Sequence, residues 1–521
     1  MVSSDSVARR VFCLDEDNFM RRVTLFLLLL LMLVPLHAQE PPSPAGALLV
    51  WLAEGSEPER KEPGVGSQLA AVFPNGVLTT LLEFDNTVIG LNRCSSQPIS
   101  ADGRRFAFFA HQPRAGIDGG TLYQMTDFGA PVLVTTLHRA ACALNGFAYS
   151  PDSAQVAYID YQDVRDDSEF INGTLTVRGV DDLQERVKIE RASALAWNGA
   201  ELVALQFFTN AGGQADEAVI SIWDGAATRE LTSVLSAQSC RFTGGQVTAA
   251  GADKIVMVIG ERCRGGDGRT RWQFYVIDRA NGSAALALSA PQEGGSFVST
   301  QTYNVIALND GATVLFSAAD GVSRDSGSVF RVDMTTLATP TRAVDRAGIF
   351  RRFTPLRYSL GDIAPAVVSP NRQFWAIVTA LPDKSELVVL DFAALDAPIR
   401  IPLQRSTDSV RVMGFTSDGT SLIYVAGDKN GADNAVFRLD LTTGVEQRLA
   451  RGQYAATIAV RSDGAAALLQ YRQTQEVQSK DYVDLVLVNP DGSQQDLLGG
   501  VVLDEAGFFK TARFAVPLAW R

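Results

Sequence analysis

The sequence predicts an all-β protein made of repeated four-stranded antiparallel meanders. The cleanest copy spans residues 412–449, where four short apolar or alternating runs are separated by turn residues. Turns are expected at Ser417-Asp418-Gly419 and at 440–444, because Gly tolerates positive φ and Asp hydrogen-bonds its own downstream backbone. One such meander cannot bury both of its faces alone. A stack of meanders can.

The meander recurs along the chain at intervals of about 45 to 60 residues, a period typical of propeller blades. In each copy a turn precedes an apolar run, and near-continuous apolar runs suit strands that are covered on both faces. The third strand usually ends in Asp, and we interpret these Asp residues as parts of hairpin turns rather than as catalytic groups. The turns that mark the first hairpin of successive copies are Ser100-Ala101-Asp102-Gly103, Ser150-Pro151-Asp152-Ser153, Asn198-Gly199-Ala200, Gly251-Ala252-Asp253, Asn309-Asp310-Gly311, Ser369-Pro370-Asn371, Ser417-Asp418-Gly419 and Ser462-Asp463-Gly464.

The strands expected at the two ends of the chain add up to one four-stranded meander. Three strands are expected near the N-terminus, at 48–53, 69–73 and 77–83, without a first strand, and a lone strand is expected at 514–521. Pairing of the last strand with the first three would close a ring and remove its exposed edges. The prediction is therefore a single closed β-propeller of four-stranded antiparallel blades. Nine units can be counted, whereas propellers typically have about four to eight blades, so eight and nine blades both stay open.

These turns also carry a family resemblance. An S-P-D-G-type turn before an apolar strand, with third strands ending in Asp before T-x-G, resembles the TolB-type, WD40-like propeller repeat. The resemblance covers residues 47–521, and it implies a propeller fold and a habit of binding, without naming a partner. The Gly-His and Trp-Asp pair of true WD repeats, the N-terminal domain of TolB proteins and the peptidase domain of prolyl-oligopeptidase-like relatives are missing from the pattern.

The N-terminal segment has the pattern of a secretory signal peptide. Met20-Arg21-Arg22 precedes an apolar run of fourteen residues, 23–36, and Ala38 offers a small residue for cleavage. The run is shorter than the roughly 20 residues that span a bilayer. We expect a leader over 1–38 with its true start at Met20, a Pro-rich linker over 39–45 and the propeller over 46–521. A leader retained as an anchor is the alternative. The predicted location is extracytoplasmic: periplasmic, cell-surface or secreted.

The net charge and the cysteine content limit the kinds of partner and metal site that the sequence predicts. The formal net charge of -12 argues against a nucleic-acid partner. If the leader is removed, four cysteines remain in an oxidising setting, and none has the C-x-x-C spacing of a zinc or thioredoxin-like motif. The blade topology puts them on one face, and it predicts two disulfides between neighbouring loops, Cys94–Cys142 and Cys240–Cys263. Four free thiols are the alternative.

The loops between second and third strands carry many acidic residues, and in a propeller they share one rim. Negative potential there fits a Ca²⁺ site or a basic partner surface; a solvated loop set that prevents association is the simpler interpretation. The weak Ca²⁺ candidates, which lack the spacing of a calcium-loop motif, are Asp163, Asp166, Asp167 and Glu169. The binding-face candidates are Asp118, Asp267, Asp325, Asp428 and Asp433.

No catalytic motif stands out, and no resident cofactor is predicted apart from the Ca²⁺ alternative. Beyond the leader the histidines are His111 and His138, and we interpret both as structural. The sequence contains no G-x-S-x-G, H-E-x-x-H or P-loop. It favours an exported, non-enzymatic propeller that binds a protein or glycan partner through its acidic loop face. The alternatives are a secreted propeller hydrolase or lyase that uses rim carboxylates on polysaccharide or peptide, and a structural envelope component.

Overall fold

The structure of the protein is a computed structural model. It describes residues 46–57, 60–61, 68–84, 90–93, 99–114, 117–127, 129–138, 146–165, 169–211, 213–264, 270–291, 305–308, 312–319, 327–336, 341–347, 366–380, 385–403, 408–428, 434–472, 482–504 and 511–520. The chain divides into two units, and every element below lies in the second, Ala47–Arg521. The predicted leader and linker lie outside the described residues. Within the described part, no helix is long and apolar enough to cross a membrane.

The described residues form antiparallel sheets and no helix, as the sequence predicted. The first sheet joins the two ends of the unit and contains β1 (Leu48–Glu57), β2 (Arg60–Lys61), β3 (Gln68–Val72), β4 (Leu78–Glu83), β36 (Val501–Asp504) and β37 (Thr511–Trp520). The second sheet contains β5 (Gly90–Arg93), β6 (Arg105–Arg114), β7 (Ile117–Thr126) and β8 (Val132–Leu137). The third contains β9 (Phe147–Tyr149), β10 (Gln155–Arg165), β11 (Glu169–Gly179), β12 (Glu185–Asn198), β13 (Glu201–Thr209), β14 (Ala215–Trp223) and β15 (Thr228–Leu235).

The remaining sheets repeat the same meander. The fourth contains β16 (Cys240–Ala250), β17 (Lys254–Cys263), β18 (Thr270–Asp278) and β19 (Ala284–Pro291). The fifth contains β20 (Val305–Leu308), β21 (Thr313–Ala319), β22 (Gly327–Asp333), β23 (Thr341–Ala347), β24 (Ala366–Val368), β25 (Phe374–Ala380), β26 (Ser385–Asp391) and β27 (Ile399–Pro402). The sixth contains β28 (Asp408–Phe415), β29 (Ser421–Asp428), β30 (Asn434–Asp440) and β31 (Glu446–Gly452). The seventh contains β32 (Tyr454–Val460), β33 (Ala466–Arg472), β34 (Tyr482–Val488) and β35 (Gln494–Leu498).

Each meander has two ends. At one end, which we call the turn end, tight turns join the first strand to the second and the third to the fourth. At the other, the loop end, the second strand passes to the third and the fourth strand finishes. Turns of neighbouring meanders touch at the turn end: Asn371 Nδ2 donates to the Asp418 carbonyl (3.0 Å). A Cβ on Gly419 would lie 2.4 Å from Asn371 Nδ2, and Gly419 has φ +71°, so this contact requires glycine.

The core lies between the sheets rather than inside any one of them. Six large clusters of buried apolar side chains each combine residues of neighbouring sheets. Phe109 of the second sheet packs with Ile159 of the third, and Leu205 of the third packs with Ile259 of the fourth. Four-stranded antiparallel units that pack face to face in this way have the architecture of a β-propeller.

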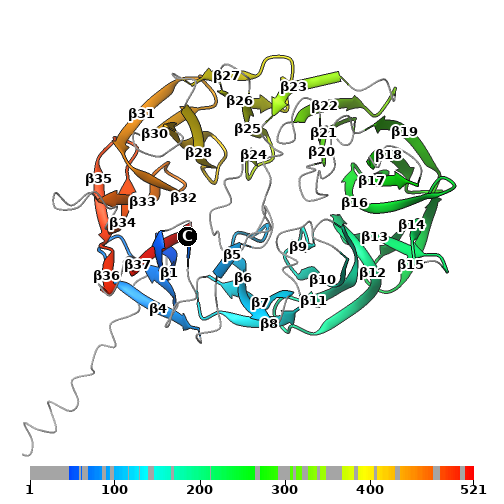
Figure 1. Cartoon of the computed structure of the whole chain (residues 1–521), viewed down its shortest axis with the longest axis horizontal. Coiled ribbons are helices and arrows are strands. Elements are labelled where there is room, and N and C mark those ends of the chain that lie inside the picture. The colour runs from blue at the N-terminus through cyan, green and yellow to red at the C-terminus, as the bar shows by residue number, and fades with distance from the viewer. Residues whose placement is uncertain are drawn as a thin grey trace, which may run out of the picture. The chain divides into compact units, whose positions relative to one another are not determined.

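The seventh sheet packs against the first and contributes to the same core. Figure 1 shows β37 beside β1, and the two strands pair antiparallel from Leu48 opposite Trp520 to Gly55 opposite Ala512. The predicted pairing of the C-terminal strand with the N-terminal strands is therefore confirmed. The indole Nε1 of Trp520 also donates to the Ala459 carbonyl (2.8 Å) of the seventh sheet. Leu518 and Leu485 belong to one buried cluster.

The strands differ from the prediction at their loop ends. β6 and β7 continue through His111 and Asp118, although polar residues there were predicted to form a loop. β10 and β11 likewise run through Asp163 and Glu169. The physical reason is that backbone pairing of a two-stranded hairpin continues wherever both strands can exchange hydrogen bonds, even where side chains are polar. An additional strand, β36, also pairs with β37 and was not predicted.

We expect the Leu518→Ala variant to lose about 2–5 kcal/mol of unfolding free energy, because it opens a cavity between the first and last sheets. Leu518 is 1% exposed. Leu133→Ala is the matched control, because Leu133 is 52% exposed, and its change should stay within about 0.5 kcal/mol. Urea unfolding curves measure both, and equal shifts would contradict the packing described.

Candidate functional site

The predicted acidic rim is described only in part. Asp118, Asp163, Glu169 and Asp428 lie at the loop ends of β7, β10, β11 and β29, and the structure describes their backbone alone. The remaining candidates lie outside the described residues: Asp166, Asp167, Asp267, Asp325 and Asp433. The Ca²⁺ prediction and the binding-face prediction therefore remain predictions.

The turn-end aspartates act as the sequence predicted, as parts of turns. Asp418 Oδ1 accepts hydrogen bonds from Thr416 Oγ1 (2.6 Å) and from the Thr420 backbone N–H (3.0 Å). The Thr416 hydroxyl and the Thr420 N–H hold the pKa of Asp418 below its usual range, because both stabilise the carboxylate. Asp440 does the same in the next turn, where Thr443 and Thr442 donate their backbone N–H groups (2.8 and 3.0 Å).

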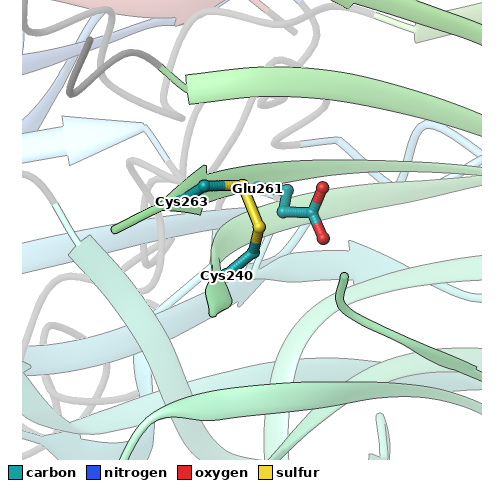
Figure 2. A group of neighbouring side chains, drawn as sticks. All are labelled: Cys240, Glu261 and Cys263. Atoms are coloured by element: carbon teal, nitrogen blue, oxygen red, sulfur yellow. A yellow bond between two sulfur atoms is a disulfide. The ribbon is translucent and has the colours of Figure 1, made fainter. Parts of the chain in front are cut away.

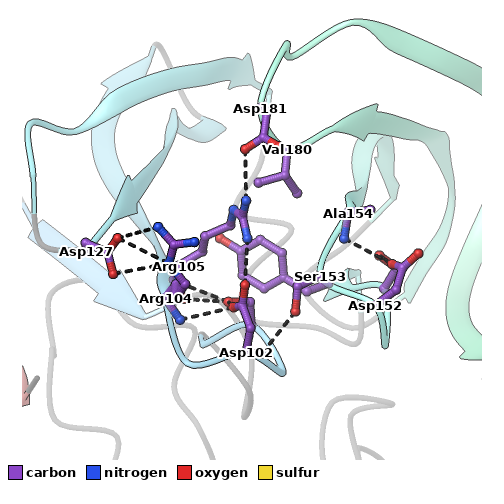
Figure 3. A network of polar contacts seen from close by, with 12 residues as sticks. Asp102, Arg104, Arg105, Asp127, Asp152, Ser153, Ala154, Val180 and Asp181 are labelled. Carbon is purple, nitrogen blue, oxygen red and sulfur yellow. Dashed lines mark hydrogen bonds and ion pairs between the residues drawn. The ribbon is translucent and has the colours of Figure 1, made fainter.

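A charged network joins two meanders at the turn end (Figure 3). Arg105 is nearly buried, and its guanidinium contacts Asp102 (2.8 Å) and Asp181 (2.8 Å), which belongs to the next sheet. The Asp102 backbone N–H donates to Ser153 Oγ (3.1 Å), also in the next sheet. Arg104 pairs with Asp127 at 2.7 Å. Every carboxylate of this network has a partner, and the contacts of Arg105 with Asp181 and of Asp102 with Ser153 connect neighbouring meanders.

The fourth sheet contains a disulfide beside a buried carboxylate (Figure 2). Cys240 and Cys263 form the predicted bond. Glu261 is 3% exposed, and its two oxygens accept from the Ala237 backbone N–H (2.6 Å) and from Gln273 Nε2 (2.7 Å). Tyr275 donates its hydroxyl to Gln273 Oε1 (2.6 Å), and burial followed by the charge of Glu261 raises the pKa of Tyr275.

The position of this disulfide differs from the prediction. We expected the bond to connect neighbouring loops, but Cys240 begins β16, Cys263 ends β17, and the two residues are direct partners in the ladder. Hairpin pairing continues to the last residue of each strand, so the bond joins the first and second strands of one meander. The predicted Cys94–Cys142 bond lies outside the described residues.

A second polar cluster lies at the loop end, where the second sheet meets the third. His138 directly follows β8, and Asp160 lies in β10. The Asp160 carboxylate accepts the His138 backbone N–H (2.8 Å) and lies 2.8 Å from Nδ1 of its ring. His138 has 60% of its side chain exposed, whereas Asp160 has 17%. Because a carboxylate oxygen accepts hydrogen bonds, Nδ1 is the donor in this contact.

Polar side chains extend this cluster across the third sheet. Thr174 is the ladder partner of Asp160, and its hydroxyl donates to Glu190 Oε2 (2.9 Å). The Glu190 carbonyl accepts from Gln206 Nε2 (2.7 Å). Glu190 is exposed. His138, Asp160, Thr174 and Glu190 together form what we call the His138 cluster, which contains one imidazole, one buried hydroxyl and two carboxylates.

Of the His138 cluster, the sequence analysis singled out His138 alone, and we interpreted this residue as structural. Asp160 and Glu190 are separated by 30 positions along the chain, and no motif spacing connects them to His138. Thr174 connects Asp160 with Glu190, because β10, β11 and β12 are neighbours in one sheet, and His138 reaches Asp160 because β8 ends beside that sheet. The cluster can bind polar groups, and an imidazole held by a carboxylate can also accept a proton from a bound molecule.

Comparisons with known proteins place the chain in no family. No model of a known protein family matches it, and no curated protein sequence does either. The TolB-type resemblance therefore remains a prediction.

Three similar solved structures show only distant likeness. A structure from work on two prolyl endopeptidases is 12% identical with a TM-score of 0.42, covering 78% of this chain and 55% of that one, so this chain spans about half its length. An oligogalacturonate lyase in complex with manganese is 10% identical with a TM-score of 0.38, covering 91% of this chain and 98% of that one. A eukaryotic initiation factor is 11% identical with a TM-score of 0.47, and the match covers 86% of this chain and 96% of that one. At these values the likeness identifies no activity for this chain.

Acid should weaken the turn that contains Asp418. The folded pKa of Asp418 is below its unfolded value of about 3.9, so its stabilisation is present above that pH and is lost as pH falls through the folded value. Asp418→Asn keeps an accepting oxygen but cannot titrate. We expect wild type to be the more stable protein at pH 7, and this advantage to shrink below about pH 4. Unfolding curves from pH 7 to pH 2.5 measure it; a constant difference would contradict the assignment.

The double variant Cys240→Ser, Cys263→Ser is expected to lose about 3 kcal/mol of unfolding free energy, because the bond closes a loop with a sequence separation of 23. Denaturant curves at neutral pH measure the loss. Reduced wild type should behave like the double variant. If reduction leaves the wild-type midpoint unchanged, the bond does not stabilise the fold as described.

Proposed function

We propose that this chain is an exported β-propeller that binds a protein or glycan partner at its loop end, through the His138 cluster and the acidic strand ends beside it. The observation that carries the proposal is the His138 cluster. It is a set of polar side chains, two of them carboxylates, with His138 and Glu190 turned to solvent. At the turn end, Asp418 and Asp440 instead accept hydrogen bonds from their own turns.

The partner that fits is one with cationic or hydroxyl groups. Asp160 and Glu190 contribute negative charge, and Asp163 and Glu169 continue β10 and β11 toward the same end. The formal net charge of -12 would draw a basic partner toward the surface. Ca²⁺ bound among Asp163, Asp166, Asp167 and Glu169 is a related proposal, because carboxylate oxygens are the ligands that Ca²⁺ prefers. Addition of calcium should then raise the melting temperature.

We propose further that the propeller is a closed ring of nine blades. The described residues form seven sheets, and two of these sheets divide into two meanders each, which gives nine meanders. In the third sheet β12 pairs with β11 through its first half and with β13 through its second. In the fifth sheet β23 and β25 are joined by the single pair Ala347–Thr379. The shared core of the first and seventh sheets supports closure.

Export is proposed from two features together. The leader pattern at 20–38 would direct secretion, and a disulfide forms and persists in an oxidising compartment. Sequencing the mature N-terminus tests the leader, and the expected first residue is Gln39. An N-terminus upstream of Ala38 in the secreted protein would contradict cleavage at that site.

Binding can be tested with a matched pair of charge variants. We expect Glu190→Gln to weaken binding of a lysine-rich model peptide about two- to fivefold, because one exposed carboxylate is lost from the His138 cluster. Glu230→Gln in β15 removes the same charge from an exposed position elsewhere and is the control. Calorimetry at low and at physiological salt measures both. Equal affinities for the two variants would place the binding surface elsewhere.

A second candidate function is favoured by the His138–Asp160 pair alone. A carboxylate-held imidazole is the arrangement of a general base, so the chain could be a secreted hydrolase or lyase that acts on polysaccharide or peptide. Screening of glycans and peptides would reveal turnover. We expect His138→Ala to lower any such kcat by about 10²–10⁴-fold, with Glu230→Gln unchanged. Turnover that survives the loss of His138 would remove this candidate.

A further inference from the structure

Three metal-ligating side chains gather at the end of the β16–β17 hairpin. The sulfur atoms of Cys240 and Cys263 and a carboxylate oxygen of Glu261 lie within 4.8 Å of one another. Cys240 and Cys263 are ladder partners, and Glu261 precedes Cys263 by two positions, so all three side chains project from one face of the hairpin. Figure 2 shows the Glu261 carboxylate beside the bonded sulfurs.

We propose that reduction of the Cys240–Cys263 disulfide turns this group into a binding site for Zn²⁺ or a similar divalent metal. This site goes beyond the proposed partner binding and does not depend on it. A reductant such as a dithiol supplies two electrons and two protons; the S–S bond breaks, two thiols form, and the dithiol becomes a disulfide. Metal binding then releases the thiol protons, because thiolate is the ligand form of cysteine.

The donor set selects the metal. Two thiolates and one carboxylate suit Zn²⁺, which is bound by cysteine sulfur and carboxylate oxygen in four-coordinate sites. The three protein ligands leave a fourth position for water. Soft thiolates disfavour Ca²⁺ and Mg²⁺, which prefer oxygen ligands.

Glu261 is already held in place for this role. The Ala237 N–H and Gln273 Nε2 each donate to one of its oxygens (2.6 and 2.7 Å), and Tyr275 orients Gln273 in turn. A carboxylate oxygen can accept more than one contact, so these bonds leave room for a metal. Partners of this kind orient metal ligands and raise affinity.

The geometry favours a metal at this group once the disulfide is reduced. Glu261 is 3% exposed and lies beside both sulfurs, so a divalent cation there would be bound by one carboxylate and two sulfur ligands. The disulfide and the metal use the same sulfur atoms, so each excludes the other, and the site reports the redox state of the protein.

The experiment uses the full chain with Cys13, Cys94 and Cys142 replaced by serine, so that only this pair remains of the five cysteines. A phosphine reductant opens the disulfide and is removed without air, and Co²⁺ and then Zn²⁺ are added. We expect the reduced protein to bind one metal per chain with a sulfur-to-cobalt absorption band. The oxidised protein should show no band, and Zn²⁺ should displace Co²⁺.

Two variants assign the ligands. Cys240→Ser should abolish the band. Glu261→Gln removes the charge and one of the two accepting oxygens, and it should weaken Zn²⁺ binding at least about tenfold. Glu230→Gln should bind as wild type. Circular dichroism checks that each variant is folded. The proposal is overturned if the folded, reduced protein binds no metal, if the oxidised protein binds equally well, or if Glu261→Gln keeps full affinity.

Discussion

A four-stranded meander exposes two apolar faces, and each face must be covered by another meander. This requirement shapes the whole described unit. Phe109 and Ile159 lie in one cluster although they belong to different sheets, and so do Leu205 and Ile259. Because the same requirement applies to the first and last meanders, the chain brings its two ends together. The long pairing of β37 with β1, and the shared cluster that contains Leu518 and Leu485, meet it.

The two ends of the meanders have different physical tasks. At the turn end, short side chains form hydrogen bonds with the backbone of each turn. The carboxylates of Asp418 and Asp440 accept hydrogen bonds from nearby backbone N–H groups. Arg105 and Asn371 then connect one turn to the next. At the loop end the hairpins continue through polar residues, as β6 and β7 do through His111 and Asp118. The His138 cluster and the Cys240–Cys263 group both lie there.

Local pattern predicted most of the architecture and little of the candidate site. The turn at Ser417-Asp418-Gly419 could be read directly, because Asp and Gly adopt turn conformations for reasons contained in a few neighbouring residues. The Cys240–Cys263 pairing could also be predicted, since the repeat places both residues at the same end of one meander. The ends of the strands at the loop end could not be predicted, because polar residues such as Asp118 occur both in strands and in loops. Whether they pair depends on the opposite strand.

The sequence by itself determined the all-β class, the repeated four-stranded unit, the structural role of the turn aspartates and the pairing of the last strand with the first. Each of these depends on alternation of side chains and on turn chemistry, which act over a few residues. Only the tertiary structure brought His138 to Asp160, and Asp160 through Thr174 to Glu190. Such contacts arise from strand register and sheet packing. These bring together residues that are far apart in the chain, so the residues have no fixed spacing that a sequence motif could detect.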